Sequence, residues 1–105
     1  MSSNFKDHRN FFLVRYEQTL KEEYINNNLS KKERDIWRRV EYENDKMINN
    51  SNTYYDYVYQ DSVATPIERA AKHFNMSVEE VTNIMLEIND RIQFYLKRKL
   101  KDSVD

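Results

Sequence analysis

Apolar residues recur at helical spacing along most of the chain, and this pattern divides the sequence into several helices. The first predicted helix runs from about Phe5 to Tyr24, with Asn4 as its cap and the asparagines 26–28 as its end. Its apolar residues form one stripe, which we expect to face a core. The stripe consists of Phe5, Phe12, Leu13, Tyr16, Leu20 and Tyr24.

A second helix is predicted to begin at Ser30, where Glu33 completes a capping box three residues later. The polar run Asn49–Asn52 ends it. Its apolar face consists of Ile36, Trp37, Val40, Met47 and Ile48. Its basic residues are Lys31, Lys32, Arg34, Arg38 and Arg39. Such a charged run is typical of a solvated face, and contact with nucleic acid is the alternative.

The segment Thr53–Gln60 is ambiguous. Its tyrosines alternate as they would in a strand, but they also fit one face of a helix, and the sequence offers no partner strand. We therefore expect a short helix or an ordered loop. Four tyrosines are too many to bury here, so they either border the core with their hydroxyls in water or form a patch that binds a partner. The candidate interface residues are Tyr54, Tyr55 and Tyr59.

Residues 65–85 predict a helix, a tight turn and a second helix. Thr65 can cap the first of these helices, and Pro66 suits its first turn. Asn75 tolerates positive φ and can end that helix. Ser77 then caps the next helix, with Glu80 completing a capping box. The apolar positions are Ile67, Ala70, Ala71 and Phe74 in the first helix and Val81, Ile84, Met85 and Ile88 in the second.

This stretch resembles the helix-turn-helix of transcription regulators. More narrowly, its T-P-x-E and M-S-x-E-x-V elements resemble the middle (region 3) domain of bacterial sigma factors. The matching positions are the small Ala71, the apolar pair Phe74 and Met76 at the turn, and the buried Val81 and Ile84. The chain departs from the family at Asn75, where Gly is usual, and at Ala70, where Ile is usual.

A second, shorter resemblance lies at residues 29–34, which match the L-S-x-x-E-R that opens the last domain of sigma factors. The helix-turn-helix that should follow it lies further along the chain than that family places it.

The helix-turn-helix resemblance implies that the helix from Ser77 enters the major groove of DNA. The candidates for base contact are Ser77, Glu79, Glu80, Thr82, Asn83 and Leu86. The candidates for phosphate contact are Arg69, Lys72, Lys97, Arg98 and Lys99. This helix has no Lys or Arg before Arg91, so basic residues from elsewhere must offset Glu79 and Glu80 if DNA is bound.

The last helix is predicted to extend to about Lys101, well beyond the helix-turn-helix at about 66–87. Its apolar stripe continues the whole way and needs a cover, which either the N-terminal helix or a second subunit provides. We predict a homodimer, with Ile92, Leu96 and Leu100 at the interface together with the tyrosines.

Composition narrows the class of protein. The chain of 105 residues has no Gly and one Pro, which disfavours hairpins and predicts one all-α domain of three to five helices over residues 1–105. With no Cys, and with His8 and His73 far apart, we expect no metal, no cofactor and no enzymatic activity. The longest apolar runs are short, so we expect no membrane contact and a cytoplasmic protein.

Two functions remain open. In the first, the chain is a small DNA-binding transcriptional regulator that acts as a dimer on double-stranded DNA. In the second, the helix-turn-helix is a scaffold for binding protein, such as RNA polymerase, a sigma factor or another regulator. The net charge of −1 and the acidic start of the last helix favour the second function, whereas the motif itself favours the first.

Overall fold

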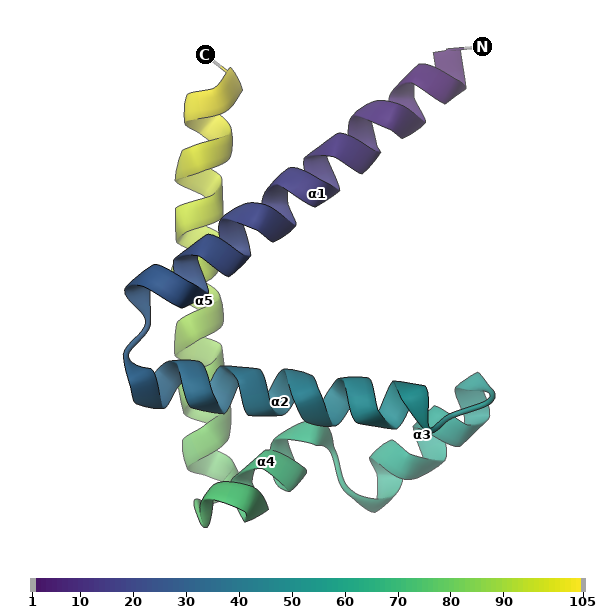
Figure 1. Cartoon of the computed structure of the whole chain (residues 1–105), viewed down its shortest axis with the longest axis vertical. Coiled ribbons are helices and arrows are strands. Elements are labelled where there is room, and N and C mark those ends of the chain that lie inside the picture. The colour runs from purple at the N-terminus through teal and green to yellow at the C-terminus, as the bar shows by residue number, and fades with distance from the viewer. Residues whose placement is uncertain (1, 105) are drawn as a thin grey trace. The chain divides into compact units, whose positions relative to one another are not determined.

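A computed structural model describes the backbone of residues 2–104 and the side chains of residues 13–101. Over this range the chain forms five helices and no strand (Figure 1), which confirms the predicted all-α class. The helices are α1 (Ser2–Asn28), α2 (Lys31–Asn49), α3 (Tyr54–Val63), α4 (Pro66–Phe74) and α5 (Val78–Val104).

The predicted capping boxes are present at α2 and α5. At α2, Glu33 N–H donates to Ser30 Oγ at 3.1 Å, and Ser30 N–H donates back to the Glu33 carboxylate at 2.9 Å. At α5, Glu80 N–H donates to Ser77 Oγ at 3.0 Å. These bonds satisfy backbone donors that have no partner inside a helix, and they fix where each helix begins.

Two further capping boxes had not been predicted. Thr65 caps α4 as expected, and Glu68 completes its box by accepting from Thr65 N–H at 3.2 Å. Thr53 caps α3 in the same way, with Asp56 as its reciprocal partner. The ambiguous tyrosine segment is therefore helical. Its capping box was missed because the usual pattern has Glu or Gln three residues after the cap, whereas this box uses Asp56.

The first helix differs from its prediction at both ends. It begins at Ser2, so Asn4 lies inside the helix rather than at its cap, and it includes the three asparagines that were expected to follow it. Leu13 and Tyr16 are exposed, so placing them on the core stripe was wrong. The buried side chains lie further along, at Leu20, Ile25 and Leu29, while the side chains of Phe5 and Phe12 fall outside the described residues.

The same correction applies at the end of α2. Ile48 is half exposed, whereas Ile36, Trp37 and Met47 are buried as predicted. A helical pattern identifies the apolar stripe but not how far a neighbouring element extends along it, so residues near the end of a stripe are placed least well.

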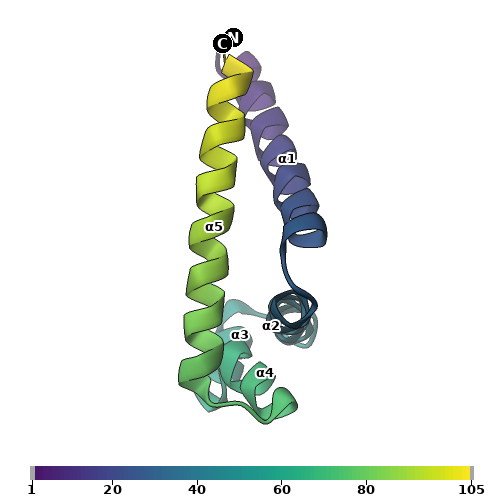
Figure 2. The same cartoon turned by 90° about the vertical axis from the view of Figure 1, so that its left-hand side faces the viewer.

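The helices form two compact units. The terminal unit contains α1, Leu29 and the part of α5 from Asn89, and the central unit contains Ser30–Ile88. In the central unit α2 runs across the start of α5: α2 lies flat and α5 upright in Figure 1, and α2 is seen end-on in Figure 2. The single domain over residues 1–105 stays a prediction.

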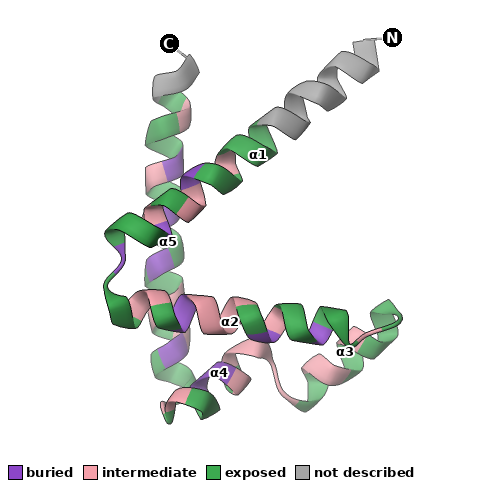
Figure 3. Cartoon of the chain, in the orientation of Figure 1, coloured by how far each residue is buried: buried purple, intermediate pink, exposed green. Residues whose placement is uncertain are grey.

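The core of the central unit joins three helices. Ile36 of α2, Ala71 of α4 and Val81 of α5 are all nearly inaccessible and form one cluster. Partly buried apolar side chains surround it, namely Val40, Ile67, Phe74, Met76, Ile84 and Met85. Figure 3 shows buried positions in α4 and α5, whereas the residues of α3 are either exposed or half-buried. No helix among the described residues is long and apolar enough to cross a membrane.

Candidate nucleic-acid interface

The turn between α4 and α5 lies in the stretch 65–85, for which the sequence predicted a helix, a tight turn and a second helix. Asn75 ends α4 in the left-handed conformation, with φ 56° and ψ 44°. Met76 N–H reaches back to the carbonyl of Ala71 at 2.9 Å, the bond that closes a Schellman motif. The chain thus passes from one helix to the next in three residues. That α4, this turn and the start of α5 form a DNA-binding motif stays a prediction.

The residues expected to be buried at this turn are placed as predicted. Ala71 and Val81 lie in the core, while Phe74 and Met76 are half-buried on either side of Asn75. A larger side chain at position 71 would enter the space occupied by Ile36 and Val81, so the small residue is needed for the two helices to approach.

The predicted base-contact residues share the outer side of the start of α5. Glu79, Asn83 and Leu86 are exposed, and Thr82 is half-buried. Ser77 is also exposed, but its hydroxyl caps the helix and donates to the Glu80 carboxylate at 3.1 Å. Glu79, Asn83 and Leu86 are therefore the side chains best placed to meet a ligand laid along this surface.

The predicted phosphate contacts are not all found together. Lys72 is exposed on α4, close in sequence to the turn. Arg69 instead holds α3: its Nε donates to the carbonyl of Ala64 at 2.8 Å, and one Nη donates to the carbonyl of Gln60 at 3.0 Å. Lys97, Arg98 and Lys99 are exposed, but they belong to the terminal unit. Of the five residues, Lys72 alone combines exposure with a position beside the turn.

Two lysines that the sequence had not linked to the turn lie beside it. Lys31 and Lys32, at the start of α2, line a shallow pocket of about 630 Å³ together with Phe74 and Met76. Glu80 lines the same pocket. Asp35 lines it as well, so the two lysines offset two carboxylates beside the acidic start of α5. No local pattern predicts this, because the residues are more than forty positions apart and only the packing of α2 on α4 brings them together.

The tyrosines of α3 form a second exposed surface, which we call the tyrosine face. Tyr54, Tyr55 and Tyr59 have exposed fractions of 77%, 82% and 70%. Val58 and Val63 are exposed beside them. Large aromatic side chains left in water in this number are typical of surfaces that bind a partner.

Polar bonds, rather than a buried core, hold α3 in place. No residue of α3 is buried. On its inner side, Tyr57 Oη donates to Asn44 Oδ1 at 2.6 Å, and Gln60 Nε2 donates to Ser51 Oγ at 2.8 Å. These contacts, with those of Arg69, fix which side of α3 faces outward.

The residues predicted to form a dimer interface on α5 are largely covered in the single chain. Ile92 is fully buried, Leu96 is 8% exposed and Leu100 is half-buried. A second subunit is therefore not needed to shield Ile92 and Leu96. Their role in an interface stays a prediction.

Among the described residues, no three His, Cys, Asp or Glu side chains lie close enough together to hold a metal ion. Comparisons of the chain with protein families, curated proteins and solved structures give no match.

Proposed function

We propose that the protein is a small DNA-binding transcriptional regulator that presents the start of α5 to the major groove. The observation that carries the proposal is the pairing of a rigid turn with an outward row of side chains. Ala71 and Val81 anchor α4 and α5 in the core, and Glu79, Asn83 and Leu86 project from the opposite side of α5. This arrangement supports the proposal, because the recognition helix of a helix-turn-helix presents an outward row of side chains to the major groove.

The chemistry of this surface indicates how it would read DNA. Asn83 can pair with both exposed groups of adenine, and Glu79 can accept a hydrogen bond from the amino group of cytosine. Leu86 offers an apolar contact for the methyl group of thymine. Because Glu79 repels phosphate, affinity has to come from cations at the edge of the surface, and Lys31 and Lys32 lie there.

We further propose that the DNA-bound form is a dimer and that it acts in the cytoplasm. One copy of the surface contacts few base pairs, and two copies about 34 Å apart would contact successive turns of the major groove. Since Ile92 and Leu96 are covered, we place the dimer contact on α1. There Leu13, Val14 and Tyr16 are 44%, 55% and 41% exposed.

Fluorescence anisotropy with duplex DNA from the region upstream of the protein's own gene tests the proposal. We expect affinity to fall steeply as salt rises, because bound phosphates release counterions. Replacing Lys31 and Lys32 with Ala should reduce the slope of log K against log salt by about 2. Lys46→Ala, an exposed lysine near the end of α2, is the matched control and should leave the slope unchanged. Undetectable or salt-insensitive binding refutes the proposal.

A second candidate function is the binding of a protein, and the tyrosine face favours it. No Lys or Arg occurs between Lys46 and Arg69, while Asp56 and Asp61 lie on α3 itself. This acidic and aromatic surface suits a partner segment that has apolar residues bordered by Lys or Arg, since cations also pack well on tyrosine rings.

A pull-down with purified bacterial RNA polymerase separates the two functions. If the tyrosine face binds it, the double variant Tyr55→Ser, Tyr59→Ser should lose the polymerase while DNA affinity stays unchanged. Both side chains are exposed, so the variant should keep its fold. Equal recovery of polymerase by the wild type and the variant argues against this function.

A further inference from the structure

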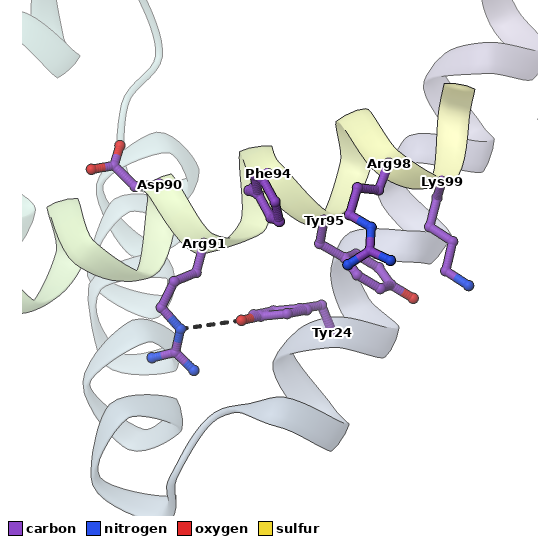
Figure 4. A pocket seen from close by; sticks show the side chains of 7 residues that line it. All are labelled: Tyr24, Asp90, Arg91, Phe94, Tyr95, Arg98 and Lys99. Carbon is purple, nitrogen blue, oxygen red and sulfur yellow. Dashed lines mark hydrogen bonds between the residues drawn. The ribbon is translucent and has the colours of Figure 1, made fainter. Parts of the chain in front are cut away.

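The terminal unit contains a pocket that neither function uses. It has a volume of about 520 Å³ and lies between Tyr24 of α1 and the part of α5 from Asp90 to Lys99 (Figure 4). This volume falls within the range of pockets that hold small molecules, about 300–1,000 Å³. All the residues that line it belong to the terminal unit.

Three aromatic rings give the pocket its apolar walls. The rings of Tyr24 and Tyr95 are 5.0 Å apart and tilted by 45°. Phe94 lines the same pocket and is 65% exposed. An aromatic ring left this open to water gains free energy when another flat apolar group covers it.

Three cations surround the rings. Arg91 is held in place, because its Nε donates to Tyr24 Oη at 3.1 Å and one Nη donates to the carbonyl of Asn28 at 3.3 Å. Lys99 Nζ lies 5.7 Å from the centre of the Tyr95 ring. Arg98 is exposed at the pocket, where its guanidinium is open to an incoming anion.

The charges are not spread evenly around the pocket. Figure 4 shows the carboxylate of Asp90 at one end, Arg98 and Lys99 at the other, and Phe94 between them. Arg91 lies at the Asp90 end and offsets that carboxylate, whereas the other end carries cations alone, so a negative group is attracted most strongly toward Arg98 and Lys99. The geometry therefore gives a bound anion a preferred direction along α5.

We propose that this pocket binds a small ligand that carries both a planar ring and an anionic group. The ring packs against Phe94 and Tyr95, and the anion meets Arg98 and Lys99. An aliphatic anion leaves the aromatic walls uncovered, and a neutral ring makes no ion pair with the exposed Arg98. Mononucleotides and aromatic carboxylates share the required chemistry.

Isothermal titration calorimetry of the full chain tests the proposal with four probes. AMP and indole-3-carboxylate represent the two sources of such a ligand, and binding of either supports the proposal and identifies the source. Adenosine and inorganic phosphate carry only one half of the chemistry each, and we expect each to bind at least tenfold more weakly than AMP if AMP is the source. Failure of both AMP and indole-3-carboxylate to bind at millimolar concentration overturns the proposal.

Variants show whether binding occurs in this pocket. Phe94→Ala and Arg98→Ala should each weaken binding of the successful probe by about tenfold, a loss of the size expected for one stacked ring or one charged hydrogen bond. Gln93→Ala and Lys101→Ala are matched controls on exposed positions of the same helix and should have no effect. Equal affinity in all four variants refutes the site.

Discussion

Two neighbouring ion pairs on α2 differ mainly in their burial. Arg39 and Glu43 are joined at 2.9 Å, and the Glu43 side chain is 8% exposed. Arg38 and Glu41 are joined at 3.1 Å, but both side chains are more than a third exposed. A buried carboxylate depends on its partner far more than one in water does, so the two pairs should contribute differently to stability.

We predict that Arg39→Ala lowers the free energy of unfolding by about 1–3 kcal/mol, because it leaves Glu43 buried without its cation. Arg38→Ala is the matched control and should cost about 0–1 kcal/mol. Urea denaturation followed by circular dichroism measures both. Equal losses in the two variants would mean that water reaches Glu43 more freely than its burial indicates.

At the same scale, the sequence predicted the residues whose roles are local. The caps at Ser30, Thr65 and Ser77, and the left-handed Asn75, each depend on side-chain chemistry within a few positions. The sequence did not predict the burial of Glu43, because that depends on how neighbouring helices cover α2.

At the scale of elements, α3 is the helix with the weakest attachment to a core. It has no buried residue, and Arg69 bonds to two carbonyls at its end, those of Gln60 and Ala64. Its attachment therefore rests on a few hydrogen bonds. Helices held this way open locally before the whole unit unfolds.

We expect Arg69→Ala to speed amide hydrogen exchange in α3 by about tenfold or more while leaving exchange at Val81 in the core nearly unchanged. The reason is that the variant frees the last carbonyls of α3 without touching the apolar cluster. Lys72→Ala, which removes an exposed cation from α4, the helix that also carries Arg69, is the control. If exchange rises equally in α3 and α5, Arg69 stabilises the unit as a whole rather than α3.

The sequence left the structure of α3 open between a helix and a loop, and the reason is physical. Alternating tyrosines fit either form, and the choice depends on the Thr53–Asp56 box and on contacts to Asn44 and Ser51. Asn44 belongs to α2, and Ser51 lies in the connection that follows α2, so these two contacts depend on how α3 packs against the preceding part of the chain. A local pattern therefore cannot show which side of α3 faces outward.

At the scale of the whole molecule, oligomeric state is the property that the proposed function needs most. We expect sedimentation equilibrium at tens of micromolar to give about twice the chain mass of 12.9 kDa. The double variant Leu13→Glu, Val14→Glu should be monomeric, because it places charges on the exposed apolar side of α1. Asn27→Asp, at an exposed position about three and a half turns further along α1, should leave the dimer intact. A monomeric wild type refutes the dimer contact.

The class of the fold was predictable from the whole sequence, but the positive charge at the candidate interface was not. Zero Gly, one Pro and helical spacing indicate an all-α chain without any knowledge of packing. The position of Lys31 and Lys32 beside Met76 depends instead on how α2 crosses α4. Long-range placement of this kind is set by the core, which a single sequence describes only as a pattern of stripes.

The burial of Trp37 makes the protein its own optical probe. It is the one tryptophan of the chain, it is 6% exposed, and it lies in the central unit. Its emission should therefore shift to longer wavelength when the central unit melts, whereas far-ultraviolet circular dichroism reports every helix. Coincident melting curves would show that residues 1–105 unfold cooperatively, and separated curves would show two independent thermal transitions.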